Sequence, residues 1–120
     1  MPHITIEHSS NVKLTRAAEE VLKDLHEILA AQPSVDMTAI KSRIITHNVY
    51  RVSDGAGANN FVHLRLDVLT GRDIALRQQM GEVLLKILVA AFEPITHGDK
   101  INYSLEVREM ERETYFKQVV

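Results

Sequence analysis

The chain contains no cysteine among its 120 residues, so it has no disulfide framework, no thiol nucleophile and no cysteine-based metal site. It also lacks a positively charged start followed by a long apolar stretch, and no apolar run is long enough to span a membrane. These absences argue against a secreted or membrane-spanning protein. We therefore expect a cytoplasmic protein that does not bind membranes.

An excess of charge of one sign is missing as well. The chain has 14 Lys and Arg against 16 Asp and Glu, a net charge of −2, so it has no global field to attract nucleic acid or an anionic membrane. The apolar fraction of 45% and the charged fraction of 25% are typical of a soluble globular protein. We expect one domain, residues 1–120.

Few local motifs for chemistry are present. Residues 55–57 have the composition of a turn and not of a phosphate-binding loop, and no nucleophile elbow marks a serine. The six histidines show no metal-ligand spacing, and His3 and His8, five residues apart on one strand, point to opposite faces. We expect neither a metal nor a cofactor, although a metal site assembled from distant histidines stays open.

Hydrophobic periodicity predicts four strands and two helices. Alternating or β-branched stretches predict strands, and helical spacing of apolar residues predicts a helix that ends before Pro33 and another that is capped by Asp73 and stops near residues 92–94. The expected strands are residues 2–8, 40–52, 61–69 and 101–107. Two strand–helix–strand units favour parallel pairing within each unit, and predict an α+β fold with one four-stranded sheet and both helices on one face.

Three further expectations concern turns and the uncovered sheet face. Residues 9–11 form a polar break with helix-capping chemistry, and residues 54–60 resemble a flexible turn between antiparallel strands. Ile44 and Ile45 lie on opposite faces of one strand, and residues 103–107 add more apolar side chains that need cover. Because large exposed apolar patches mark interaction sites, we expect a symmetric oligomer with sites at subunit boundaries.

Proline directly behind the initiator methionine is the most informative feature that is present. If Met1 is removed, the Pro2 nitrogen becomes a free secondary amine that can accept a proton. An α-amino group ordinarily titrates at about pH 8, and both burial and nearby cations lower that pKa. A buried Pro2 among cations would therefore be a neutral general base at physiological pH. By itself, Pro2 also has the ordinary explanation that a small second residue permits methionine removal.

Three cations could act with Pro2. Lys41 and Arg43 are two residues apart on a predicted strand, so both project from one face, and Arg72 lies in the turn before the second helix. Such cations would lower the pKa of a terminal amine and bind an anionic substrate, and arginine can bind a carboxylate through two hydrogen bonds. Taken singly, each is more often a solvated surface charge.

Several segments occur in an order that is recognisable. They are Pro2-His3-Ile4, Ile40-Lys41-Ser42-Arg43, Phe61-Val62-His63-Leu64, Gly71-Arg72, Arg77-Gln78-Gln79-Met80-Gly81-Glu82 and the tail Tyr115-Phe116-Lys117-Gln118. Together they resemble the 5-carboxymethyl-2-hydroxymuconate isomerase family of the tautomerase superfamily. The resemblance implies a tautomerase-like β-α-β-β-α-β fold with a four-stranded mixed sheet, assembled as a homotrimer.

The resemblance also implies an activity and a set of site residues. It implies a cofactor-free keto–enol isomerase acting on a small anionic substrate, an unsaturated 2-hydroxy (di)carboxylic acid such as 5-carboxymethyl-2-hydroxymuconate. Pro2 would act as base and then acid, and Lys41 and Arg72 would hold substrate carboxylates or the developing charge. Arg43 is a weaker candidate for the same role, and Phe61 would supply an apolar wall.

One departure from the family pattern leaves other functions open. The family reads Ile-Arg-Ser-Arg where this chain has Lys41 between Ile40 and Ser42, and lysine lacks the planar two-pronged donor set of arginine. The departure bears on the dicarboxylate substrate more than on proton transfer. Two alternatives are a non-catalytic trimeric binding or scaffold protein, and a Pro2-dependent decarboxylase or hydratase of an unsaturated acid.

Overall fold

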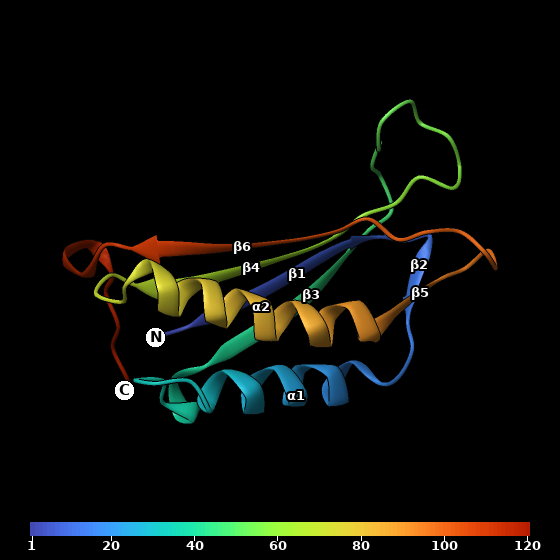
Figure 1. The fold of residues 1–120 in the computed structure, drawn as a ribbon. Coiled ribbons are helices and arrows are strands. Elements are labelled where there is room, and N and C mark those ends of the chain that lie inside the picture. Colours follow the sequence, from blue (N-terminus) through green and yellow to red (C-terminus); the bar gives the residue numbers. More distant parts are fainter.

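The computed structural model describes residues 1–120 and shows one four-stranded sheet with two helices on the same face (Figure 1). The helices are α1, Ala18–Ala30, and α2, Ile74–Ala91. In spatial order, the strands are β3 (Lys41–His47), β1 (His3–Ser9), β4 (Val62–Leu69) and β6 (Tyr103–Met110). The predicted β-α-β-β-α-β order and the mixed sheet are confirmed.

The strand pairing gives the two halves of the chain the same topology. β1 pairs with β3 in parallel, β4 pairs with β6 in parallel, and the two halves join through the antiparallel pair β1–β4. The even-numbered apolar side chains of β1 and β4, such as Ile6 and Leu64, face the helices and are fully buried. Burying one such side chain contributes about 1.5–3 kcal/mol, so this alternation drives the packing of sheet on helices.

The two helices begin differently. The Asp73 carboxylate accepts a hydrogen bond of 2.8 Å from the Leu76 amide, which confirms the predicted cap of α2. Helix α1 begins after Ala17, which has no capping side chain. The expectation that residues 9–11 cap this helix is therefore wrong, because those residues form the turn from β1 into a short strand, β2.

A second, two-stranded sheet was not predicted. β2, Val12–Leu14, pairs antiparallel with β5, Phe92–Pro94, directly after the end of α2. Strands of three residues are too short to show an alternating pattern. The pair buries Val12 and Phe92 and so extends the core at the end of the helices.

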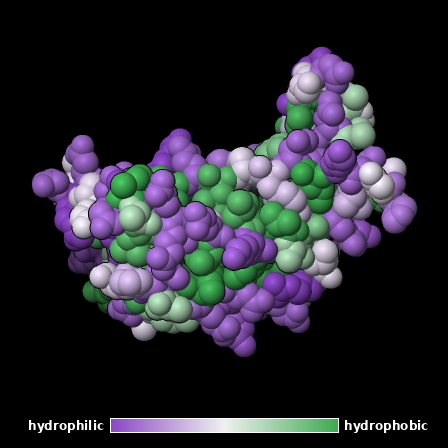
Figure 2. Space-filling model, viewed as in Figure 1, coloured by the Kyte–Doolittle hydropathy of each residue, from purple (hydrophilic) through white to green (hydrophobic).

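The predicted strand over residues 40–52 is too long. β3 ends at His47, and the chain from there to β4 forms a projecting loop that is largely hydrophilic (Figures 1 and 2). Because β1 lies between β3 and β4, residues 54–60 do not form a turn between paired strands. Asn60 is buried at the base of the loop and donates to the Lys100 carbonyl at 2.9 Å.

The sheet face opposite the helices is polar, which corrects the expected apolar second face. Residues 103, 105 and 107 of β6 pack toward the helix layer. The open face instead carries charged and hydrogen-bonding side chains, joined by contacts such as Arg65–Asp67 at 2.9 Å and His47–Glu7 at 2.9 Å. Ile45 is an apolar exception, 40% exposed. The argument for an oligomer from a bare apolar face therefore fails. Neither helix is both long enough and apolar enough to cross a bilayer.

Candidate active site

The amino terminus lies at one end of the sheet, next to the part of the chain that follows β6 (Figure 1). Pro2 is buried, and its carbonyl accepts a hydrogen bond of 3.1 Å from the Lys41 amide, which ties the start of β1 to the start of β3. Met1 is only partly exposed. The first residues are therefore held within the fold and do not extend into solvent.

Positive charges surround this terminus. Burial lowers the pKa of the Met1 amino group below its ordinary value of 8.0, and the charges of Arg72, Arg112, Lys117 and Lys41 lower it further, in that order. Each of these effects disfavours the protonated form of an amine. The Pro2 nitrogen lies one residue deeper, so an amine at Pro2 would lie within the same burial and near the same cations.

Arg72 is held in place by the turn that contains it. Gly71 has a φ of 125°, a conformation that residues with a Cβ rarely adopt, and this places Arg72 beside the segment between α1 and β3. The Arg72 guanidinium donates to the Ser34 carbonyl at 2.8 Å. Its Nε is buried without a hydrogen-bond partner. Arg72 is therefore fixed in position and has a donor that the chain leaves unsatisfied.

Lys41, like Arg72, is a cation that the sequence predicts to act with Pro2, and it also lies near the amino terminus. It is the first residue of β3 and is exposed, and its ammonium contacts only the Ala39 carbonyl, at 3.5 Å. No carboxylate pairs with it. The fold thus brings Pro2, Lys41 and Arg72 to one end of the sheet.

Arg43 and Phe61 are placed differently. Arg43 lies on the open face and donates to His3 Nδ1 at 3.1 Å and to Thr5 Oγ1 at 3.2 Å. Phe61 lies at the far end of β1, where its carbonyl accepts from the Ser9 amide at 3.0 Å. Seven strand residues separate the two ends by about 20 Å. Within one chain, Phe61 is therefore not beside Pro2.

The sequence reasoning missed the cations of the carboxyl-terminal segment. Arg112 donates to the Thr70 carbonyl at 2.8 Å, and the Lys117 ammonium lies 3.7 Å from the Met1 sulfur. Tyr115, between them, contacts His3 through its hydroxyl at 2.9 Å. The tail shows no periodicity from which the position of these residues in the fold could be predicted. Its likeness to the family was the one signal in the sequence that pointed to them.

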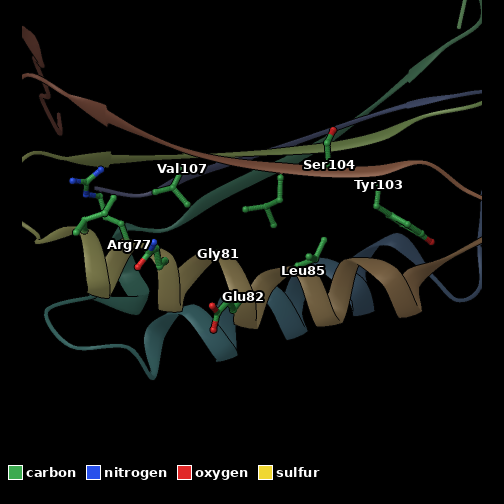
Figure 3. A pocket seen from close by; sticks show the side chains of 10 residues that line it. Arg77, Gly81, Glu82, Leu85, Tyr103, Ser104 and Val107 are labelled. Atoms are coloured by element: carbon green, nitrogen blue, oxygen red, sulfur yellow. The ribbon is translucent and has the colours of Figure 1, made fainter. Parts of the chain in front are cut away.

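The larger concave surfaces lie along the flanks of the helices. A groove of about 580 Å³ runs between α2 and β6, and Figure 3 shows Tyr103 and Val107 pointing from the strand toward the helix while Ser104 points away. A second groove, of about 600 Å³, lies between α1 and β3 and includes Lys41. Neither groove is lined by Pro2. No three His, Asp or Glu side chains come together as a metal site.

Comparison with known proteins identifies the family. The model of the 5-carboxymethyl-2-hydroxymuconate isomerase family matches residues 2–119. The chain belongs to this family. Among its relatives, the 5-carboxymethyl-2-hydroxymuconate Delta-isomerase of Escherichia coli is 27% identical over 118 residues, covering 98% of this chain and 94% of the relative. The chain is thus an isomerase of the tautomerase superfamily.

Solved structures have the same fold as this family member. A 5-carboxymethyl-2-hydroxymuconate isomerase from Deinococcus radiodurans R1 superposes with a TM-score of 0.81 at 24% identity, covering 98% of this chain and 88% of that one. A fused 4-OT wild-type symmetric trimer superposes with a TM-score of 0.68 at 14% identity, covering 92% and 87%. The fold therefore extends beyond relatives of recognisable sequence.

Proposed function

We propose that this isomerase converts an unsaturated 2-hydroxy (di)carboxylic acid, such as 5-carboxymethyl-2-hydroxymuconate, to its 2-oxo isomer without a cofactor. The observation that carries the proposal is the convergence of Arg72, Lys41 and two further cations on a partly buried amino terminus. This setting favours a neutral amine and an anionic substrate together. The name of the Escherichia coli relative supports the choice of substrate.

The reaction needs a single group that accepts and then donates a proton. Neutral Pro2, exposed by removal of Met1, takes the proton of the 2-hydroxyl group, the conjugated double bonds shift, and the same nitrogen returns the proton to a distant carbon. An O–H bond breaks and a C–H bond forms, with no net change in composition. Arg72 and Lys41 bind carboxylates and offset the negative charge that develops on the oxygen.

The working assembly in this proposal is a homotrimer. The symmetric trimer among the solved structures supports it, and β3 and β6 are both edge strands whose outer backbone groups are free to pair. Phe61, as an apolar wall, would come from a neighbouring chain, because it lies far from Pro2 in its own chain. Arg43 would act through His3, which it contacts. The partners are a small anionic substrate and further copies of the chain, not nucleic acid or membrane.

The test begins with the intact mass of the purified protein, which should show that Met1 is absent. An ultraviolet assay on 5-carboxymethyl-2-hydroxymuconate then compares the wild type with Pro2→Ala and Arg72→Ala. We expect Pro2→Ala to lower kcat/KM roughly a hundredfold or more, the usual range for loss of a general base. Arg72→Ala should cost roughly tenfold to a hundredfold, as for loss of a charge-assisted hydrogen bond.

Arg51→Ala is the matched control, because Arg51 lies in the projecting loop and bonds to the Asp54 carbonyl. It should leave the rate unchanged. A mature protein that retains Met1 would rule out the Pro2 mechanism. Rates no higher than the uncatalysed background in the wild type and in both site variants would indicate a scaffold without turnover.

A further inference from the structure

The chain after β6 returns to the amino terminus. We call residues 111–117 the carboxyl-terminal segment. It begins with a short 3-10 helix, Arg112–Thr114, and runs from the end of β6 back past Met1 (Figure 1). Arg112 donates to the Thr70 carbonyl at 2.8 Å, and its guanidinium lies 3.3 Å from where a Cβ of Gly71 would stand. Arg112 thus stabilises the turn that contains Arg72 through these contacts.

Tyr115 anchors the middle of this segment to the residue after Pro2. Its hydroxyl lies 2.9 Å from His3 Nε2, and the two rings pack edge to face with centroids 6.0 Å apart. Arginine has only donors, so Arg43 must donate to His3 Nδ1, and Nε2 carries the hydrogen that is donated to Tyr115. Burial lowers the pKa of His3, and Arg43 and Lys41 lower it further, which favours the neutral imidazole that this arrangement requires.

Lys117 follows two residues later and has no strong acceptor. Its ammonium lies 3.7 Å from the Met1 sulfur, a weak acceptor that leaves with Met1. Asp36 is near enough for Lys117 to contribute to lowering the pKa of its carboxyl group, but the two form no ion pair. That carboxylate already accepts hydrogen bonds from the Thr38 amide and hydroxyl. Lys117 is therefore a cation near the amino terminus that forms no ion pair within the chain.

The substrate has more carboxylates than the two assigned cations can bind. Muconate is a dicarboxylate, and the carboxymethyl group of 5-carboxymethyl-2-hydroxymuconate adds a third. Lys41 and Arg72 account for two. We propose that Lys117 binds the third carboxylate, and that Tyr115, through its bond to His3, is a positioning residue that places Lys117. This inference rests on the proposed function and specifies which acids the site prefers.

Two substrates separate this role from a structural one. They are 5-carboxymethyl-2-hydroxymuconate and 2-hydroxymuconate, which differ only by the carboxymethyl group. With Lys117→Gln we expect kcat/KM for the tricarboxylate to fall about tenfold, chiefly through KM. We expect kcat/KM for the dicarboxylate to fall by a much smaller factor, because Lys117 ranks below burial, Arg72 and Arg112 in lowering the pKa of the terminal amine. Lys117→Arg should restore the preference. Lys100→Gln, in the exposed turn before β6, is the matched control and should change neither value.

Tyr115→Phe tests the positioning role. It removes the hydroxyl that accepts from His3 and leaves the ring packing in place. We expect the tricarboxylate preference to fall about threefold, by less than in Lys117→Gln, while kcat for the dicarboxylate stays the same. A wild-type preference in Tyr115→Phe would refute the positioning role. Equal losses on both substrates, or no loss on either, in Lys117→Gln would overturn the role of Lys117.

The role of Lys117 in binding can also be tested independently of turnover, by measuring the affinity for acids that cannot react. Calorimetric titration compares pentane-1,2,5-tricarboxylate with adipate, which have the carbon skeletons and carboxylates of the two substrates but lack the double bonds and the 2-hydroxyl group. The wild type should bind the tricarboxylate more tightly, and Lys117→Gln should remove the difference. That result without any turnover would contradict the proposed function and leave this inference standing. Turnover with equal wild-type affinity for both acids would overturn this inference alone.

Discussion

Lys41 occupies a position where the resemblance leads us to expect arginine, and its surroundings show what the change means. The ammonium is exposed, contacts only the Ala39 carbonyl, and lies beside Pro2. A lysine here keeps the positive charge near the amine. It presents a point charge to a carboxylate, whereas arginine presents two parallel donors. The departure therefore concerns how tightly the substrate is held.

Lys41→Arg should improve substrate binding. We expect KM for 2-hydroxymuconate to fall about threefold, with kcat nearly unchanged, because two-pronged binding stabilises the bound acid and not the proton transfer. Steady-state ultraviolet kinetics would measure this, with Lys86→Arg on the exposed side of α2 as the control. An unchanged KM in Lys41→Arg would show that Lys41 does not contact the substrate.

At the scale of the elements, the two helices differ in how their first turns are satisfied. The first four backbone amides of a helix have no partner within the helix, and a capping side chain supplies one. Asp73 does this for α2, whereas Ala17 leaves the start of α1 without such a bond. The packing of both helices on the sheet, more than their termini, therefore holds α1 in place.

Capping variants should shift stability in opposite directions. Asp73→Ala should lower the free energy of unfolding by about 1 kcal/mol, whereas Asp73→Asn should retain most of it. Ala17→Ser should raise it by about 0.5–1 kcal/mol, because Ala17 is exposed and its backbone is already extended. Urea unfolding at one fixed protein concentration would measure all three. Unchanged stability in Asp73→Ala would show that the bond to Leu76 contributes nothing.

For the whole molecule, the open sheet face and the two free sheet edges constrain the assembly. The face is charged, so any copy that packs against it must keep contacts such as Arg65–Asp67 satisfied or supply new partners. The edges β3 and β6 offer backbone groups, which pair without such a cost.

For the proposed homotrimer, native mass spectrometry should give a mass about three times the 13.6 kDa of one chain. Because the proposal takes Phe61 from a neighbouring chain, dilution to dissociate the trimer should reduce specific activity in parallel with the loss of that species. A monomer with full activity would contradict the trimer and the role of Phe61 together.

The local hydrophobic pattern and the capping residues determined most of the secondary structure of this protein and which side chains face the core. Alternation in residues 61–69 and the spacing of Val21, Leu25 and Leu29 indicated which side chains face the core, because burial acts on each element with its own period. The order strand–helix–strand, repeated, predicted the sheet with its helix layer. The sequence also indicates Pro2, Lys41 and Arg72 as candidate site residues.

Only the tertiary structure decided which ends of the elements meet. Alternation assigns a side chain to a face but says nothing of strand order, so the insertion of β1 between β3 and β4 and the distance of Phe61 from Pro2 emerged only from the fold. The same holds for Lys117, which lies more than a hundred residues from Met1 in the chain. Tyr115, two residues before it, contacts His3 across almost the whole chain, and such a long-range bond leaves no periodic pattern in the sequence.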